Sequence, residues 1–240
     1  MGTYIKRELV YEGKAKKVFG TDADGVCIVE YKDEATAGNG AKKGVIPGKG
    51  AVNNRVTNRL MRLLEGHGIP THFIEELDDV SAAVRRVEIV PLETIVRNIA
   101  AGSLAARLGL AEGAKLHSPV LEYCYKNDAL GDPMVNEYHI VAMGWASHSE
   151  LETIAEYSFM ANAVLGEYLR GAGIELVDFK LEFGRADDGK ILLADEISPD
   201  TCRFWDIKTG KKLDKDRFRR DLGGVEEAYN EVLERLFGQG

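Results

Sequence analysis

The sequence predicts an α+β protein of two lobes, an N-terminal antiparallel β lobe over residues 1–90 and a C-terminal α/β lobe over residues 91–240. This prediction rests on two features of the sequence. Short strand-like runs fill most of the first third of the chain, and strands are mixed with helices in the remainder. This arrangement favours a ligand-binding cleft between the two lobes.

The N-terminal lobe is expected to contain several short strands and one helix. The strand-like runs cover residues 8–11, 16–19, 26–31, 71–75 and 84–90. Glycine-containing turns separate the first three runs. Apolar residues at helical spacing predict a helix that begins near Asn53 and ends at Gly66.

The C-terminal lobe is expected to mix both kinds of element. Strands are predicted over residues 93–97, 120–125, 176–184 and 191–197, and helices over 104–108, 149–169, 216–222 and 225–237. Ser103 is placed to cap the first of these helices and Gly109 to end it. The longest helix is predicted to start at Ser149, which forms a capping-box pattern with Glu152, and Phe159 is expected to face the core.

The predicted strand over residues 176–184 carries a row of charges. Side chains alternate between the two faces of an extended strand, so Asp178, Lys180 and Glu182 share one face. The apolar residues that share the other face are Val177, Phe179, Leu181 and Phe183. Burial of that apolar face would hold two carboxylates and an ammonium in a fixed row, which makes the row a candidate site.

An Asp-Gly turn then predicts a hairpin whose second strand returns beside the charged row. The expected register places Arg185 opposite Lys190. Asp195 then lies opposite Lys180, whereas a slip of one residue would present Glu196 instead. Three carboxylates around one lysine suit a divalent cation and a polyphosphate, but a salt-bridge ladder on a solvated face explains the alternation equally well.

Two further groups of residues are candidate anion sites. The turn over residues 13–17 combines one glycine with three lysines, which suits a triphosphate, although lysine-rich turns are usually solvated surface. Arg97 at a strand end and Ser103 at a helix start suit a carboxylate or a monophosphate, and Arg203 is a second candidate contact. Each arginine taken alone is more often part of a surface salt bridge.

The composition excludes several classes of protein. The chain has 240 residues, 45% of them hydrophobic, which is enough for a full core. A formal charge of -8 argues against a general binder of nucleic acids or membrane surfaces. Three scattered cysteines fit neither a disulfide framework nor a zinc cage, and no long apolar run occurs near the N-terminus, so a cytoplasmic protein is expected.

Over nearly its whole length the chain resembles the SAICAR synthetase family, the phosphoribosylaminoimidazole-succinocarboxamide synthases of de novo purine synthesis. The most specific matching segments are PLETIVRNIAAGS at residues 91–103 and VDFKLEFG at residues 177–184. Supporting segments, in the right order, are YEGKAK at 11–16, VNN at 52–54, KND and DP within 126–133, and ADE and SPD within 194–200, followed by Arg203. Asn39 and Gly131 depart from residues that some relatives carry, and these departures concern only loop contacts to substrate.

The resemblance implies a fold similar to ATP-grasp enzymes and protein kinases, with ATP between the lobes. It implies that carboxyaminoimidazole ribotide is joined to L-aspartate while ATP is split to ADP and phosphate with Mg²⁺, and that the protein is a homodimer. The implied roles are ATP binding by Gly13, Lys14, Ala15, Lys16, Val18, Glu182 and Asp195, Mg²⁺ binding by Glu182 and Asp195, ribotide binding by Arg97, Ser103, Asp200 and Arg203, and catalysis by Lys180 and Asp178. A small-molecule kinase on a related fold and a nucleotide sensor without turnover are the alternatives.

Overall fold

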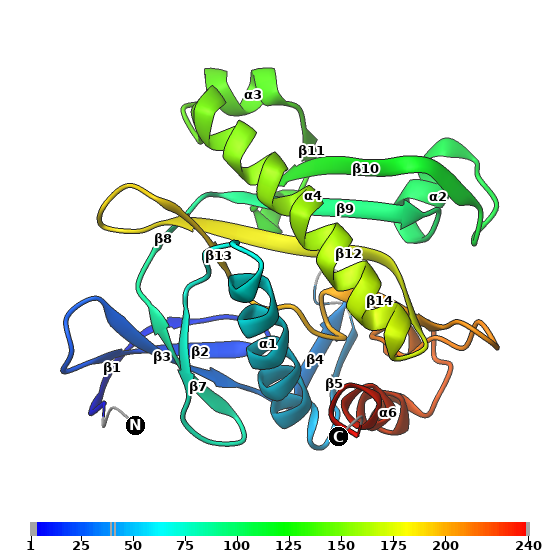
Figure 1. Ribbon diagram of the computed structural model, residues 1–240, viewed down its shortest axis with the longest axis horizontal. Helices are drawn as coiled ribbons and strands as arrows, with labels where there is room; N and C mark the ends of the chain where they lie inside the picture. The colour runs from blue at the N-terminus through cyan, green and yellow to red at the C-terminus, as the bar shows by residue number, and fades with distance from the viewer. Residues whose placement is uncertain (1–3, 39, 41, 239–240) are drawn as a thin grey trace.

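The computed structural model describes residues 4–38, 40 and 42–238. Asn39, one of the two departures from the family pattern, lies outside the described residues. Two antiparallel sheets make up most of the fold, and helices pack between and beside them (Figure 1). The predicted α+β class is therefore confirmed.

The first sheet is formed by five strands in the order β1-β2-β3-β7-β6. These strands are β1 (Lys6–Glu12), β2 (Lys16–Thr21), β3 (Val26–Tyr31), β7 (Ser81–Arg85) and β6 (Phe73–Glu76). Alternate residues of β3, namely Cys27, Val29 and Tyr31, pack with Val84 of β7 in a small apolar cluster. A separate hairpin of β4 (Glu34–Ala37) and β5 (Lys42–Val45) follows β3.

The second sheet has seven strands, with β12 at its centre. Its main order is β11-β10-β9-β12-β13, and β14 and β8 also pair with β12. The bounds are β8 (Glu88–Ile89), β9 (Leu92–Ile99), β10 (Lys115–Tyr125), β11 (Met134–Val135), β12 (Ile174–Arg185), β13 (Ile191–Ala194) and β14 (Cys202–Asp206). Because β12 pairs with four other strands, its side chains are fixed from several directions.

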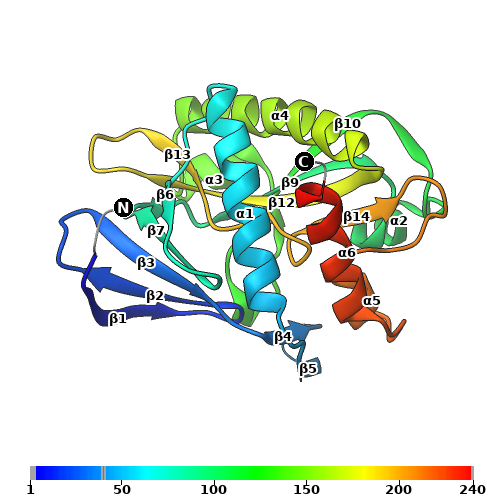
Figure 2. The same ribbon diagram turned by 60° about the horizontal axis from the view of Figure 1, so that its bottom comes forward.

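Six α-helices and one 3₁₀ turn are found in the described part of the chain. Their bounds are α1 (Lys49–Gly66), α2 (Gly102–Leu108), η1 (Asp128–Leu130), α3 (Glu137–Ala142), α4 (His148–Gly171), α5 (Asp216–Arg219) and α6 (Val225–Phe237). Helix α4 crosses the seven-stranded sheet, and α1 lies between the five-stranded sheet and α6 (Figure 2). Among the described residues, no helix is long and apolar enough to cross a membrane.

The main hydrophobic core draws on residues from both sides of position 90. It joins Leu60 and Leu64 of α1 with Leu165 of α4 and with Phe179 and Phe183 of β12. All five side chains are essentially inaccessible to solvent. The two sheets are thus held against a shared apolar layer.

The structure corrects three predictions about helices. The long helix begins earlier than predicted, because Ser147 rather than Ser149 is its N-cap and forms the capping box with Glu150. Both serines have a glutamate three residues later, so the pattern alone could not choose between them. Phe159 is 42% exposed and does not belong to the core. Ser103 does not cap α2, whose N-cap is Ala101 and has no side-chain hydrogen bond.

The lengths of several predicted elements also differ from the structure. Helix α1 begins at Lys49, one turn before the predicted start, and α5 ends at Arg219 rather than at residue 222. The predicted strand over residues 84–90 is divided between β7 and β8, which belong to different sheets. The β4–β5 hairpin and α3 were not predicted, because both are short and carry weak periodicity.

The register predicted for the β12–β13 hairpin is wrong by one residue. Ala186, not Arg185, closes the turn with Lys190 by a hydrogen bond of 2.9 Å, and Arg185 pairs with Ile191. The sheet pairing also ends at Ala194, three residues before the predicted end. A continued ladder in this register would bring Glu196, not Asp195, opposite Lys180.

Candidate active site

Lysines and carboxylates meet where β2, β9, β12 and the end of β13 come together. This lysine cluster consists of Lys16, Lys126, Lys180, Glu93, Glu182, Asp195 and Glu196. Lys180 Nζ lies 2.5 Å from Glu182 Oε1 and 3.3 Å from Asp195 Oδ2. It also lies 3.4 Å from Glu93 Oε1, so one ammonium contacts three carboxylates.

Asp195 reaches Lys180 by a route that differs from the predicted one. Its backbone adopts a φ of 59°, in the left-handed region that residues other than glycine, asparagine and aspartate seldom adopt. This turn directs the carboxylate toward Lys180 although the ladder register does not. The opposite oxygen, Oδ1, pairs with Lys16 at the start of β2. Asp195 therefore joins the two sheets through its two oxygens.

The other members of the lysine cluster balance the remaining charges. Lys126 Nζ lies 2.5 Å from Glu182 Oε2, and Lys16 Nζ lies 3.2 Å from Glu196 Oε1. Burial alone would raise the pKa of the Asp195 carboxyl, but Lys16 and Lys180 together hold that pKa far below its usual range. Burial alone would lower the pKa of the Lys180 ammonium, but Glu182 and Asp195 outweigh burial and raise that pKa above its usual value. Lys180 is therefore a cation at neutral pH.

The donor set of the lysine cluster fits a magnesium ion that is shared with phosphate groups. In the part of the chain that the structure describes, no three His, Cys, Asp or Glu side chains are gathered as a metal cage. Glu182 and Asp195 do converge on the same lysine, and both supply hard oxygen donors. Mg²⁺ at nucleotide sites is usually held by one or two carboxylates plus phosphate oxygens, and these two residues satisfy that requirement.

Arginines and carboxylates form a second cluster beside the first. This arginine cluster consists of Arg97, Arg107, Arg203, Ser103, Glu122, Asp178 and Asp216. Arg97 donates from Nε to Glu122 Oε2 at 2.6 Å and from Nη1 to Asp178 Oδ2 at 2.9 Å. Arg203 Nη1 donates to both oxygens of Asp178, at 2.8 and 3.0 Å. Asp178 therefore lies between two guanidinium groups.

Neither arginine is an ordinary surface salt bridge, because both are largely buried. The Arg97 side chain is only 4% exposed, and its Nη2 donates to Ser103 Oγ at 3.0 Å. Arg203 Nε donates to Asp216 Oδ2 at 3.0 Å. Arg97, Ser103 and Arg203 lie close together, as expected. Arg97 contacts Ser103 directly, and Arg97 and Arg203 both contact Asp178.

Gly102 allows Arg203 to approach the start of α2. Its φ of 51° is left-handed, and a Cβ atom built on it would lie 2.4 Å from Arg203 Nη2. Any larger residue would therefore collide with the guanidinium group and carry backbone strain as well. The arginine cluster therefore needs a glycine at position 102, so that Arg203 can lie against the start of α2.

The lysine-rich turn closes the β1–β2 hairpin at the edge of the lysine cluster. Gly13 N donates to Lys16 O at 2.9 Å, and Ala15 O accepts from Lys32 N at 2.8 Å. The Lys14 side chain is 46% exposed and contacts Asp128 of η1 at 2.5 Å. Val18 packs against the small apolar cluster of the five-stranded sheet. Of these candidates, only Lys16 lies within the lysine cluster.

Asp200 differs from the other candidate ribotide ligands. Its Oδ1 accepts a hydrogen bond of 2.6 Å from the Tyr229 hydroxyl, and its Oδ2 lies 3.0 Å from Lys49 Nζ and 3.4 Å from Lys215 Nζ. The Lys49 side chain is fully buried. Asp200 therefore neutralises a buried lysine and fixes α1 to α6 and to the segment before α5.

Strand β12 carries the residues that connect the two clusters. Asp178 belongs to the arginine cluster, whereas Lys180 and Glu182 belong to the lysine cluster. The predicted sharing of one face by these three residues holds. Val177 is an exception on the apolar side, because a register irregularity between Leu176 and Asp178 moves it into a separate cluster with Ile99.

Several members of the two clusters were not identified from the sequence as site residues. They are Glu93, Lys126, Arg107, Glu122 and Asp216, whereas Glu196 was named only as the alternative to Asp195. Glu93 and Lys126 lie inside sequence segments that match the family pattern, which was an available signal. Glu122 and Asp216 had no such signal, because only the pairing of β10 with β9 and the position of α5 bring them to the arginines.

This α+β fold, with a lysine–carboxylate cluster beside an arginine cluster, is typical of an enzyme that brings a polyphosphate to a second anionic substrate. The family model described as SAICAR synthetase matches residues 9–236 of the chain. The chain belongs to the SAICAR synthetase family.

Individual relatives are similar over almost the whole chain. The phosphoribosylaminoimidazole-succinocarboxamide synthase of Coprothermobacter proteolyticus is 60% identical over 96% of this chain and 98% of its own length. That of Desulfitobacterium hafniense is 62% identical over 96% and 97%. The crystal structure of the Ehrlichia chaffeensis synthase has a TM-score of 0.94 at 47% identity, covering 95% of this chain and 98% of that one. A SAICAR synthetase in complex with ADP has a TM-score of 0.93 at 50% identity, covering 97% and 98%.

Proposed function

We propose that this chain joins carboxyaminoimidazole ribotide to L-aspartate to form SAICAR, with cleavage of ATP to ADP and phosphate, in de novo purine biosynthesis. Membership of the SAICAR synthetase family supports this activity, and so does the ADP bound to a relative with the same fold. The observation on this chain that carries the proposal is the placement of Asp178 and Lys180 on one strand, between an arginine cluster and a lysine cluster.

The lysine cluster and the adjoining turn are proposed to bind ATP. Lys14 and Lys16 supply positive charge, and Gly13 and Ala15 let the backbone approach the phosphates. Val18 contributes an apolar side chain on the same sheet. The nucleotide would then lie between the five-stranded sheet, within residues 1–90, and the seven-stranded sheet, all of whose strands except β8 lie within residues 91–240.

Glu182 and Asp195 are the proposed carboxylates for Mg²⁺. When bound, the ion would neutralise charge on the phosphate oxygens during phosphoryl transfer. Lys126, Lys16 and Lys180 also contact these two carboxylates. Lysine side chains are long and flexible, so they can turn from a carboxylate to a phosphate oxygen without a change of the backbone.

The arginine cluster is the proposed site for the ribotide. Arg97, Ser103 and Arg203 place planar guanidinium donors and a hydroxyl around one point, which suits an anionic group with several oxygens. Asp178 occupies this point in the structure and competes for the same donors. Asp200 would contribute to ribotide binding indirectly, by orienting Lys215. The Lys215 ammonium lies 3.4 Å from Asp200 Oδ2.

Activation of the ribotide carboxylate is the chemical reason for the use of ATP. A carboxylate is a poor acyl donor toward an amine, because oxide would have to leave. A carboxylate oxygen therefore attacks the γ-phosphorus, ADP leaves, and an acyl phosphate forms. The aspartate amine then attacks the acyl carbon, and phosphate and a proton leave. Lys180, at the point where the clusters meet, neutralises charge on the transferring phosphoryl group.

Other properties follow from this proposal. An enzyme of purine biosynthesis would act in the cytoplasm, and a homodimer is proposed from the resemblance to the family. The substrates are small molecules, and the formal net charge of -8 argues against a nucleic acid as a partner.

ADP release by the purified protein tests this function. The protein would be supplied with ATP, Mg²⁺ and carboxyaminoimidazole ribotide, with and without L-aspartate. We expect sustained ADP release only with L-aspartate, with one SAICAR formed per ADP. Release at an equal rate without L-aspartate, accompanied by a stable phosphorylated product, would instead indicate a kinase. ADP binding without any turnover would indicate a nucleotide sensor.

A further inference from the structure

Arg203 is bonded to two carboxylates through different guanidinium nitrogens. Nη1 donates to both oxygens of Asp178, at 2.8 and 3.0 Å, and Nε donates to Asp216 Oδ2 at 3.0 Å. Nη2 lies against Gly102 at the start of α2, and no hydrogen bond from Nη2 is found to any described residue. The N–H donors of Nη2 therefore remain for a ligand.

The two carboxylates differ in their relation to the proposed ribotide site. Asp178 lies where the ribotide would bind and competes with it for the same donors. Asp216 contacts a different nitrogen, so it can keep Arg203 in place when Asp178 releases Nη1. Because a guanidinium group is planar, a bond at Nε also fixes the direction of both Nη groups.

Asp216 is itself held in place by bonds to the sheet. It is the first residue of α5 and is only 1% exposed. Its backbone N–H donates to Asp214 Oδ1 at 2.7 Å, and Asp214 Oδ2 accepts from Phe204 N at 2.9 Å. Asp214 thus fixes the start of α5 to β14, at the residue that follows Arg203.

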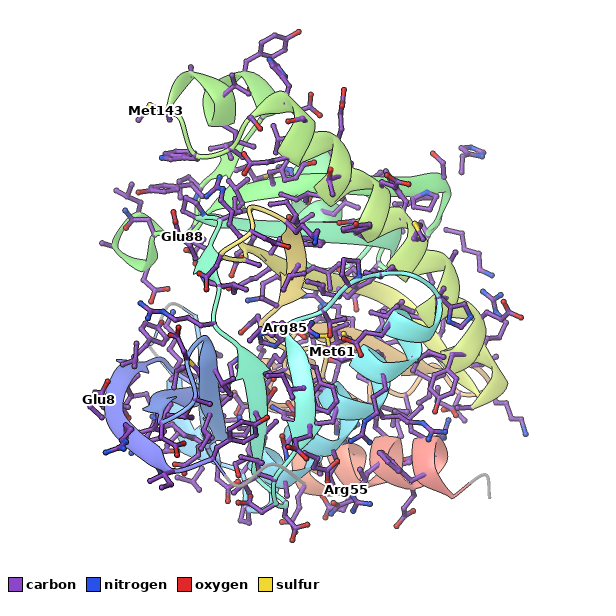
Figure 3. All side chains as sticks on the ribbon, turned by 60° about the vertical axis from the view of Figure 1, so that its left-hand side comes forward. Glu8, Arg55, Met61, Arg85, Glu88 and Met143 are labelled. Atoms are coloured by element: carbon purple, nitrogen blue, oxygen red, sulfur yellow. The ribbon has the colours of Figure 1, made fainter. Side chains whose placement is uncertain are left out.

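The segment that carries Asp216 is also anchored on its C-terminal side. Helix α6 follows α5, and its residues Tyr229 and Val232 belong to the main hydrophobic core. Arg55 of α1 lies beside α6, with its guanidinium carbon 4.9 Å from the centroid of the Phe237 ring (Figure 3). The position of Asp216 is therefore set by the protein as a whole and does not depend on Arg203 alone.

The charge of Asp216 is secured by further arginines. Its Oδ1 accepts from Arg219 Nη1 at 2.8 Å, and Arg220 Nη2 lies 3.4 Å from its Oδ2. Burial alone would raise the pKa of the Asp216 carboxyl, but Arg203 and Arg219 lower that pKa to about 2. Asp216 is therefore a carboxylate at neutral pH and a strong acceptor for Arg203.

We propose that Asp216 is a positioning residue for ribotide binding. Its carboxylate holds Arg203 at Nε and so aims the Nη donors at the anionic group of the ribotide. This inference rests on the proposed assignment of Arg203 to the ribotide and goes beyond it by naming the residue that orients Arg203. A displacement of a binding group by about 1 Å can cost about 100-fold, so such a residue matters although it does not touch the ligand.

The test compares Asp216→Ala, which removes both acceptors, with Asp216→Asn, which keeps one oxygen that cannot serve Arg203 and Arg219 together. Asp206→Ala is the matched control. Asp206 also lies on β14, is 7% exposed and pairs with an arginine, but its partners Arg235 and Thr209 belong to neither cluster. The readouts are the Kd for ribotide and for ADP, measured calorimetrically, and the melting temperature.

We expect Asp216→Ala to raise the ribotide Kd about tenfold, with the Kd for ADP within about twofold of wild type. Asp216→Asn should be intermediate. Asp206→Ala should lower the melting temperature and bind the ribotide normally. An unchanged ribotide Kd in a folded Asp216→Ala protein would overturn the proposal, as would an equal loss of ribotide affinity in Asp206→Ala. If Asp216→Ala does not fold, Asp216→Asn decides: a ribotide Kd equal to that of wild type would overturn the proposal.

Arg203→Ala separates failure of this inference from failure of the proposed function. In this variant Asp216 keeps Arg219 and Arg220 as partners, so its carboxylate is not left unpaired. If Arg203→Ala binds the ribotide as wild type does, the assignment of Arg203 to the ribotide is wrong. If Arg203→Ala weakens binding, adding Asp216→Ala should cause no further loss, because Asp216 acts only through Arg203. An additive second loss would contradict the inference alone.

Discussion

The lysine cluster and the arginine cluster solve the same electrostatic problem with different side chains. Both place carboxylates beside cations, and both draw on β12. They differ in exposure: the Lys180 and Asp195 side chains are 23% and 16% exposed, whereas those of Arg97 and Asp178 are both 4% exposed. The Lys180–Asp195 pair is therefore more accessible to solvent and ligand than the Arg97–Asp178 pair.

The choice of cation matches this difference. A lysine ammonium is a compact charge on a flexible chain, so it can exchange a carboxylate for a phosphate oxygen as a reaction proceeds. A guanidinium group is planar, and each of its bonds has a fixed direction, so it orients a bound anion. Under the proposed function, phosphates would change partners in the lysine cluster while the arginine cluster would hold the ribotide in place.

Replacement of Lys180 should have the largest effect. In Lys180→Ala, Lys16 still pairs with Asp195 and Lys126 still pairs with Glu182, so the fold and ADP binding should survive. The charge on the transferring phosphoryl group would lose its cation, and kcat should fall by about 10³-fold. Steady-state kinetics and ADP titration would measure both quantities. Lys190→Ala, which removes an exposed ion pair with Asp188, is the matched control and should be nearly silent.

Replacement of Arg97 by lysine keeps the charge but removes the planar fork. One ammonium cannot reproduce the directed bonds that Arg97 makes to Glu122, Asp178 and Ser103. The ribotide KM should rise by about 10- to 100-fold, and unfolding should become easier by about 2 kcal/mol. ADP affinity should change by less than about twofold, because the lysine cluster is intact. A loss of ADP affinity as large as the loss of ribotide affinity would show that the two clusters are not separate sites.

A smaller effect is expected from Gly102→Ala. The new methyl group would displace the Arg203 guanidinium, which lies 2.4 Å from the Cβ position, and the ribotide KM should rise about tenfold. Gly109→Ala is the matched control, because Gly109 has a φ of 65° but no neighbouring atom within 4 Å. Both variants should lose similar stability from backbone strain. Equal ribotide KM values in the two variants would contradict the role assigned to Gly102.

The smallest effect concerns an ion pair outside both clusters. The hydrogen bond from Arg185 lowers the pKa of Glu150, in the capping box of α4, to about 2. The folded pKa lies below the ordinary value of 4.5, so this contribution to stability is present above pH 4.5 and is lost as the pH falls toward 2. Glu150→Gln should reduce the free energy of unfolding by about 1 kcal/mol at pH 7.

Urea unfolding at pH 7 and near pH 2 would measure this difference. The gap between Glu150→Gln and wild type should close at the lower pH, and kcat at pH 7 should be unchanged. A gap that persists near pH 2 would mean that the Glu150 charge is not what stabilises the start of α4.

Many residues of both clusters could be predicted from the sequence, but the strand register that brings them together was predicted less well. Alternation along β12 was enough to place Asp178, Lys180 and Glu182 on one face, because a strand's period is fixed at two residues. The neighbouring hairpin could not be placed with the same certainty, since one residue in the turn shifts its whole register. Asp195 contacts Lys180 as expected although the predicted register was wrong, because its left-handed backbone compensates for the shift.

Contacts between distant segments were the part that no local pattern contained. Glu122 meets Arg97 only through the pairing of β10 with β9, and Lys49 meets Asp200 only when α1 packs on the segment before β14. Lysines are usually exposed to solvent, so nothing in the sequence indicated that Lys49 is buried or that Asp200 is its partner. The resemblance to the SAICAR synthetase family supplied the activity, which periodicity and charge alone did not determine.

We propose that ATP activates the ribotide carboxylate where the two clusters meet. This proposal is tested most directly with carboxyaminoimidazole ribotide labelled with ¹⁸O in its carboxylate, incubated with the protein, ATP, Mg²⁺ and L-aspartate. Formation and collapse of an acyl phosphate must transfer one carboxylate oxygen to phosphate, so mass spectrometry should find one ¹⁸O in each phosphate released. Phosphate without the label, formed together with SAICAR, would contradict the account.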